Sequence, residues 1–157
     1  MAASIARINT SEGGVPKRAV AEAEVTELGL AGDRQRDRQS HGGTERALCL
    51  FAIENIQAMQ AQGHPIAPGT TGENITTQGL DWAAVTPGTR LRLGESVEVE
   101  ITGYTAPCDN LTAFFSDGDY MRMSAERDPA NSRVYARVLR GGLIRAGDPV
   151  AVLKPTG

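Results

Sequence analysis

The sequence is poor in aromatic residues, in cysteine and in long hydrophobic runs. Aromatic residues make up 4% of the 157 positions, and two cysteines are too few for a disulfide framework. The longest uninterrupted apolar run, Ala47 to Ile53, is far shorter than the ~20 residues that a membrane-spanning helix needs. The first twenty residues contain no apolar stretch ahead of a small-residue cleavage site. These absences exclude a membrane-spanning helix and lead us to expect a cytoplasmic protein.

Lysine is also scarce, because 14 of the 16 basic residues are arginine. The net charge of -3 provides no overall footprint for nucleic acid, but residues 122–145 hold six arginines against only two acids. The planar guanidinium suits carboxylate and phosphate recognition, whereas most charge runs are simply solvated faces. Both interpretations stay open. A chain of this length fits one hydrophobic core, so we expect a single domain over residues 1–157 with its core at roughly 5–153.

Turn residues and alternating patterns predict short strands and few helices. The chain has 18 glycines and 8 prolines, which favours frequent turns. Apolar and polar residues alternate as in half-buried strands, and we predict such strands over residues 18–28, 96–102 and 133–139. The apolar run 47–51 predicts a buried central strand, followed by a helix over 54–62 that ends at Gly63.

Two segments share a pattern that is typical of small barrels. Residues 85–93 and 144–152 each have an apolar residue, two spacers, a glycine and then an alternating strand. Residues 109–127 carry helix signals, and a hairpin is plausible at Gly94-Glu95. The sum is an α+β fold that is mostly β, with a closed, barrel-like sheet and a few short helices.

Cys108 is the residue that points most directly to chemistry. It follows Pro107 and precedes Asp109, a good N-cap for a short helix. At a helix N-terminus the dipole favours thiolate, the form that attacks, carries sulfur or binds a soft metal. Cys49, in contrast, lies within an apolar run and is expected to be a small buried core residue.

Two glycine-rich segments are candidate binding loops. Residues 29–34 and the following His41-Gly42-Gly43 present backbone amides and an arginine, which suits an anion or simply a mobile loop. Residues 69–77 place Glu73 and Asn74 after a glycine bend, which either holds a turn or reads a heterocycle. Neither segment is a phosphate-binding P-loop, since the Gly-Lys-Ser/Thr ending is absent.

Taken together, these segments resemble one family in their order and spacing. Residues 13–17, 29–33, 41–43, 72–77 and 107–108 follow the pattern of the MOSC domain, named for the C-terminal domain of molybdenum cofactor sulfurase. The match covers roughly residues 5–153, and the His-Gly-Gly and Gly-Glu-Asn blocks with the single loop cysteine make it specific. The chain looks like the compact bacterial single-domain members, which are related to proteins of resistance to N-hydroxylated base analogues.

The resemblance implies that the protein binds the pterin-based molybdenum cofactor. Cys108 would be the metal ligand or a sulfur carrier, and Lys17 and Arg34 would pair with the terminal phosphate. Glu73 and Asn74 would lie along the pterin or near the metal, and His41 would line the same pocket. The cofactor-binding set that we carry over is Lys17, Asp33, Arg34, His41, Gly42, Gly43, Glu73 and Asn74, to which we add Arg137 from the arginine-rich strand.

The implied reaction is molybdenum-dependent reduction of an N-hydroxylated substrate, with His41 or Glu73 assisting proton transfer. The chain shows no signal for pyridoxal phosphate, a flavin or an iron-sulfur cluster, so electrons would arrive from a separate redox partner protein. Two alternatives stay open. Cys108 carries a persulfide or the pocket stores and delivers the cofactor, or else the pocket binds another anion and the thiol is incidental.

Overall fold

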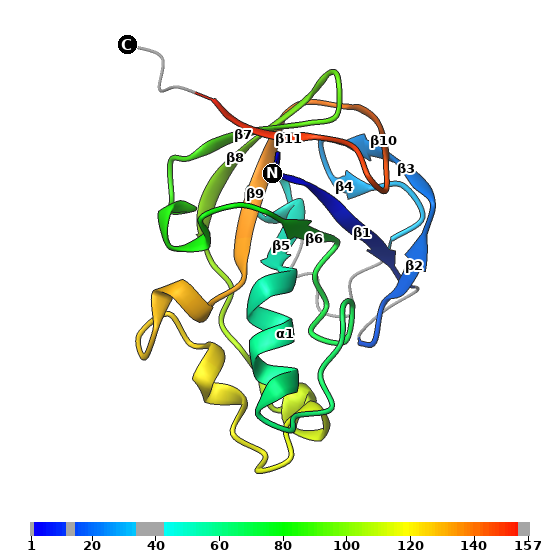
Figure 1. The fold of residues 1–157 in the computed structure, drawn as a ribbon. Coiled ribbons are helices and arrows are strands. Elements are labelled where there is room, and N and C mark those ends of the chain that lie inside the picture. Colours follow the sequence, from blue (N-terminus) through cyan, green and yellow to red (C-terminus); the bar gives the residue numbers. More distant parts are fainter. Residues whose placement is uncertain (1, 12–14, 34–42, 154–157) are drawn as a thin grey trace.

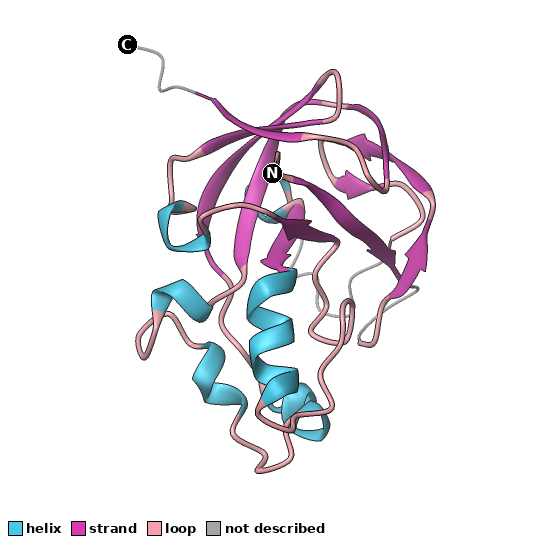
Figure 2. Ribbon diagram, viewed as in Figure 1, coloured by secondary structure: helices cyan, strands magenta, loops and turns pink. Residues whose placement is uncertain are grey.

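The structure is a computed structural model, and it describes residues 2–11, 15–33 and 43–153. Two sheets contain most of its regular structure (Figures 1 and 2). The larger sheet has eight strands in the order β11-β7-β8-β9-β5-β6-β1-β2, and the smaller has three in the order β10-β3-β4. The strands are β1 Ser4–Thr10, β2 Arg18–Val20, β3 Glu22–Thr26, β4 Gly29–Leu30, β5 Leu48–Ala52, β6 Ile75–Gln78, β7 Arg90–Leu93, β8 Val97–Tyr104, β9 Val134–Arg140, β10 Gly142–Arg145 and β11 Val150–Leu153.

The described residues contain one α-helix and five short 3-10 helices. The predictions of a mainly β, α+β fold with few helices are therefore confirmed. The helices are α1 Ile53–Ala61, η1 Thr44–Arg46, η2 Trp82–Ala84, η3 Asp109–Phe114, η4 Tyr120–Met123 and η5 Pro129–Asn131.

Strand β5 lies inside the larger sheet because all five of its residues are apolar and buried. It pairs antiparallel with β9 and parallel with β6. Parallel neighbours need a crossover connection, and α1 supplies part of it, with Ile56 and Met59 buried. The helix ends before Gly63, which has a φ of 95°. The central strand, the helix and its glycine stop, and the β7–β8 hairpin are confirmed as predicted.

The prediction of a closed barrel is wrong for the described part of the chain. The larger sheet is open, because its edge strands β11 and β2 do not pair with each other. The nearest approach to closure is a single bridge between Ser4 and Pro149, with backbone hydrogen bonds from Ile5 N to Asp148 O at 2.8 Å and from Val150 N to Ala3 O at 2.9 Å. The two repeated glycine patterns do precede neighbouring strands, since β7 and β11 pair antiparallel.

Two element predictions need correction. The alternating segment 18–28 is divided between β2 in the larger sheet and β3 in the smaller, so the chain changes sheets there. The segment 109–127 forms two separate 3-10 helices, because Gly118, at a φ of 72°, lies in the turn between them.

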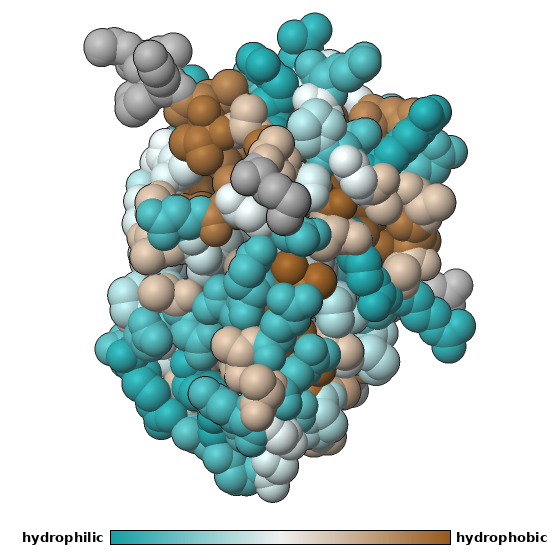
Figure 3. Space-filling model, in the orientation of Figure 1, coloured by the Kyte–Doolittle hydropathy of each residue, from teal (hydrophilic) through white to brown (hydrophobic). Residues whose placement is uncertain are grey.

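The surface divides between the sheets and the helical region. Figure 3 shows hydrophobic surface gathered over the sheets in the upper half of the view, and mainly hydrophilic surface over α1 and the short helices below. None of the helices in the described ranges is both long enough and apolar enough to cross a membrane.

Candidate functional site

Lys17 and Asp33 form a buried ion pair. The Lys17 Nζ lies 2.7 Å from both Asp33 carboxylate oxygens, and the two side chains are only 6% and 5% exposed. The same carboxylate accepts hydrogen bonds from the Ser11 backbone N–H at 2.9 Å and from Asn74 Nδ2 at 2.8 Å. Asp33 therefore compensates the charge of Lys17. The neutral donors of Ser11 and Asn74 hold the carboxylate in place.

Asn74 connects this ion pair to the sheet. Its side-chain oxygen accepts from the Cys49 backbone N–H at 2.9 Å, and its own N–H donates to the Cys49 carbonyl at 2.7 Å. Its carbonyl accepts from the Asn9 N–H at 2.7 Å. Asn74 thus joins β5 and β1 just before β6 begins, which explains why a buried amide stands at this position.

Glu73 is fully buried and is surrounded by donors from its own turn. One carboxylate oxygen accepts from the Gly69 N–H at 3.1 Å and the Thr76 hydroxyl at 3.0 Å, and the other from the Thr71 hydroxyl at 2.8 Å. Burial raises the pKa of Glu73 above its ordinary value, and these hydrogen bonds offset part of that rise. The residue holds the 69–76 turn together, and its expected part in proton transfer stays a prediction.

Gly69 brings this turn against Lys17. The Lys17 N–H donates to the Gly69 carbonyl at 2.8 Å. Gly69 has a φ of +86°, and a Cβ at this position would lie 2.4 Å from the Lys17 carbonyl oxygen. Only glycine allows this approach. The structure therefore brings Lys17, Asp33, Glu73 and Asn74 into one cluster, which we call the lysine-aspartate cluster.

Cys108 is exposed on the loop that leads from β8 to η3. Its thiol donates to the Asn110 side-chain oxygen. Cys108 itself occupies the N-cap position of η3 and makes no side-chain cap, so the prediction that Asp109 is the N-cap is wrong by one residue. The prediction that one thiol is buried and one accessible is confirmed, because Cys49 is buried in β5.

Cys49 joins the cluster to the loop of Cys108. Its sulfur lies 3.6 Å from the Thr105 hydroxyl, at the end of the β8 region. Burial is the main cause that raises the pKa of the Cys49 thiol. A buried thiol of this kind is suited to packing, and the accessible thiol three residues beyond Thr105 is the one open to chemistry.

Arg133 is a site residue that the sequence reasoning did not single out. Its side chain donates to the Thr71 carbonyl at 2.5 Å and to the Ala106 carbonyl at 3.3 Å, and the residue is 6% exposed. It therefore holds the Glu73 turn and the Cys108 loop side by side. Its place in a run of six arginines was visible in the sequence, but nothing there distinguishes a buried arginine from a solvated one.

Arg137 lies apart from the lysine-aspartate cluster and faces carboxylates. One guanidinium nitrogen is 2.8 Å from Glu100 and another is 3.3 Å from Glu45. These partners raise the pKa of Arg137 above its ordinary value. The side chain borders a cavity of about 390 Å³, lined by Glu27, Thr44, Glu45, Arg137, Val138, Leu139 and Gly141. Its expected cofactor contact remains a prediction.

The remaining predicted residues lie at or beyond the limits of the described chain. Arg34, His41 and Gly42 fall outside the described residues. Gly43 is exposed and precedes η1 with a φ of 79°. Within the described ranges, no three His, Cys, Asp or Glu side chains come together as metal ligands.

Comparisons with known proteins agree on one family. A family model for the MOSC domain matches residues 37–151. Protein YiiM of Escherichia coli is 32% identical over 106 residues, covering 65% of this chain and 47% of YiiM. A protein named "Reductase" from Gibberella moniliformis is 28% identical over 130 residues, covering 80% of this chain and 23% of that protein. The crystal structure of Escherichia coli YiiM superposes with a TM-score of 0.73 at 26% identity, covering all of this chain and 72% of the other. The chain spans about half the length of the first of these curated relatives.

Proposed function

The chain belongs to the MOSC domain family, and we propose that it binds the pterin-based molybdenum cofactor through Cys108 and reduces N-hydroxylated substrates. The observation that carries the proposal is the placement of Cys108. It is an exposed thiol on a loop that Arg133 ties to the turn of Glu73. Cys108 is thus both the cysteine of the family motif and an accessible thiol that can bind a soft metal.

The residues present fit such a group in their chemistry. Molybdenum prefers a soft thiolate, which Cys108 can supply, and a pterin phosphate prefers fixed positive charge and oriented donors. Arg133 has a buried Nε with no hydrogen-bond partner among the described residues, which leaves a donor for an incoming acceptor. When bound, the cofactor would supply the metal centre at which the N–O bond of the substrate is reduced.

The chain's own residues have distinct roles in this proposal. Lys17 and Asp33 form a buried ion pair without net charge, and Asn74 fixes that pair to β5. Arg34 and His41 follow in the adjoining segment, where we expect the phosphate contact and a proton donor. Cys108 would hold the metal. We expect the electrons to arrive from a separate redox partner protein.

A second candidate, a sulfur carrier, rests on the same exposed thiol. Cys108 is accessible while Cys49 is buried, so a sulfane sulfur transferred from the persulfide of a donor protein, which leaves as a thiol, would attach to Cys108 alone. Such a protein would carry one additional sulfur on Cys108 and would not reduce N-hydroxylated compounds.

The test is the molybdenum and pterin content of protein purified from a host that makes the cofactor. Wild type is compared with Cys108→Ala and with the buried control Cys49→Ala. Near-stoichiometric metal in wild type and in Cys49→Ala, and none in Cys108→Ala, is the expected result. Wild type that contains neither metal nor pterin would contradict the reductase proposal, and mass spectrometry of Cys108 would then test for carried sulfur.

A further inference from the structure

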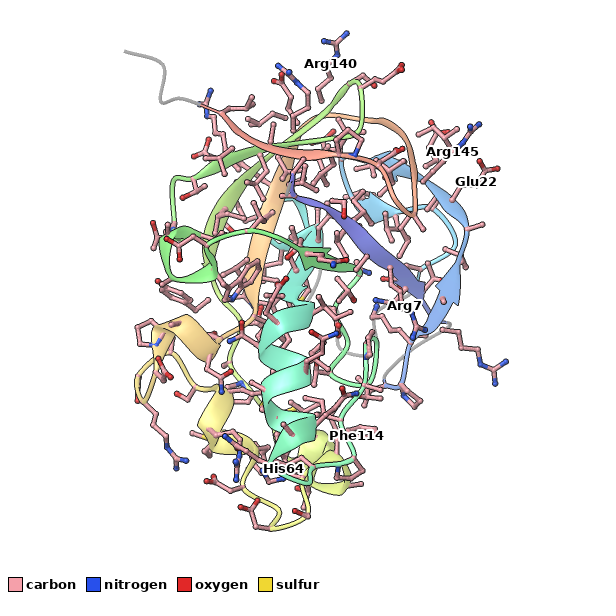
Figure 4. All side chains as sticks on the ribbon, in the orientation of Figure 1. Arg7, Glu22, His64, Phe114, Arg140 and Arg145 are labelled. Carbon is pink, nitrogen blue, oxygen red and sulfur yellow. The ribbon has the colours of Figure 1, made fainter. Side chains whose placement is uncertain are left out.

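Arg133 differs from the other arginines of the 122–145 stretch. Of the six, four form ion pairs with carboxylates: Arg122 with Asp117, Arg127 with Asp119, Arg137 with Glu100, and Arg145 with Glu22. Arg140 is exposed at the end of β9, and Figure 4 shows it pointing outward at the top of the view. Arg133 is the buried member of the set, and no carboxylate of the described residues lies within ion-pair distance of it.

Among the described residues, the guanidinium of Arg133 has only neutral hydrogen-bond partners. Two of its nitrogens donate to the carbonyls of Thr71 and Ala106, and its Nε is buried without a hydrogen-bond partner among the described residues. A buried charge is costly unless an opposite charge compensates it, and carbonyl dipoles provide only part of that compensation. The described residues thus leave this positive charge without a compensating carboxylate.

This charge lies beside the loop of the exposed thiol. Ala106 is two residues before Cys108, and the Thr105 N–H donates to the Arg133 carbonyl at 2.9 Å. Arg133 is therefore bonded to this loop through both its side chain and its backbone. The shared loop places Arg133 near Cys108 along the chain, and Cys108 is exposed on that loop.

We propose that Arg133 is the anion-recognising residue of the Cys108 site, and that it attracts a tetrahedral oxyanion, either a phosphate group or a metal oxyanion, to the side of the thiol. The inference deepens the proposed function, because it concerns the same Cys108 site, but it holds or fails on protein that carries no cofactor. Arg133 would act as a positioning residue for the ligand and for the loop.

The rates at which charged and neutral reagents alkylate Cys108 report the positive charge near its thiol. The rate with anionic iodoacetate is divided by the rate with neutral iodoacetamide, on cofactor-free protein at low salt, with Cys108→Ser as the background. A nearby cation raises this ratio, and added salt lowers it by screening. A residue that only holds the loop would change both rates together and leave the ratio unaltered.

Variants of Arg133 distinguish the effect of its charge from its structural role in holding the loop. Arg133→Met is expected to lower the ratio by about twofold or more, as a single charge acts over several ångströms in a solvated loop. Arg133→Lys, which keeps the charge, should retain most of the ratio, and the exposed control Arg140→Met should leave it unchanged. A ratio for Arg133→Met equal to that of wild type overturns the proposal.

A second measurement uses wild type alone, so the test does not depend on the folding of the variants. Inorganic phosphate and molybdate, each compared with chloride at equal ionic strength, should slow alkylation by iodoacetamide. Slowing by both identifies a general oxyanion site, and slowing by molybdate alone identifies a metal oxyanion as the ligand. Alkylation that neither anion slows, with a ratio that does not respond to salt, overturns the proposal whatever the metal content of the loaded protein.

Discussion

Replacement of Glu73 by alanine should be one of the most destabilising single changes in the chain. The carboxylate accepts from three buried donors: the Gly69 N–H and the hydroxyls of Thr71 and Thr76. A buried donor left without an acceptor costs about 1–3 kcal/mol. Hydroxyls can rotate toward other acceptors whereas the N–H cannot, so we expect a loss of about 3–6 kcal/mol in the free energy of unfolding.

Glu73→Gln is the matched control, because it keeps the shape of the side chain. The amide oxygen can accept from Gly69 and Thr76, while the amide nitrogen donates to the Thr71 hydroxyl, which can reverse its role. We expect a loss of about 1 kcal/mol. Urea titrations followed by the fluorescence of the single tryptophan, the buried Trp82, provide the measurement.

The difference in the free energy of unfolding between wild type and Glu73→Gln should also depend on pH. Burial raises the pKa of Glu73 in the folded protein, so the folded state binds its proton more tightly than the unfolded chain does. The carboxyl makes its full contribution to stability when the pH lies below 4.5, the ordinary pKa of a glutamate. That contribution is lost as the pH rises through the pKa of Glu73 in the folded protein. The advantage of wild type over the glutamine variant should therefore be largest below pH 4.5 and should narrow as the pH rises above that value. Equal stability of the alanine and glutamine variants, or an advantage that widens with pH, would refute the reasoning.

Other predictions concern the ion pair and the glycines. Lys17→Met should cost about 3 kcal/mol, because it leaves the buried Asp33 carboxylate without its cation. Adding Asp33→Asn should recover part of that loss in urea titrations, and full additivity of the two changes would contradict a buried pair. Gly29→Ala should cost more than about 2 kcal/mol, since its Cβ would lie 2.4 Å from the Ala47 carbonyl oxygen. Gly63→Ala, which shares a positive φ but has open space, should cost about 1 kcal/mol in the same urea titrations, and equal losses at the two glycines would count against the close contact.

Elements that depend on local pattern could be predicted from the sequence. The continuous apolar run at 47–51 leads to a strand buried on both faces, and the spacing within 54–62 leads to a helix that ends at Gly63. Barrel closure could not be predicted, because it depends on which distant edges pair, and turn-and-strand patterns are the same in open and closed sheets.

The site could be predicted in its members but not in its contacts. The motif order singled out Lys17, Asp33, Glu73 and Asn74, and the structure brings them together. The ion pair between Lys17 and Asp33 could not be predicted, because it depends on the distance between the two side chains in the folded protein. Arg133 was missed for the same reason, since burial of one arginine among six depends on the packing of two loops far apart in the sequence.

The contact between β1 and the segment before β11 has a consequence for how the chain folds during synthesis. Residues 3–5 form backbone hydrogen bonds with residues 147–150, so strands from opposite ends of the described chain complete each other. A growing chain emerges from the ribosome from its N-terminus, and β1 would wait for this partner until nearly all of these residues have been translated. Such distant pairing also slows folding in general, because a long loop must close before its contacts form. Residues 3–5 would therefore lack this backbone partner until residues 147–150 have been translated, and chaperone binding to that edge of β1 would matter most in this period.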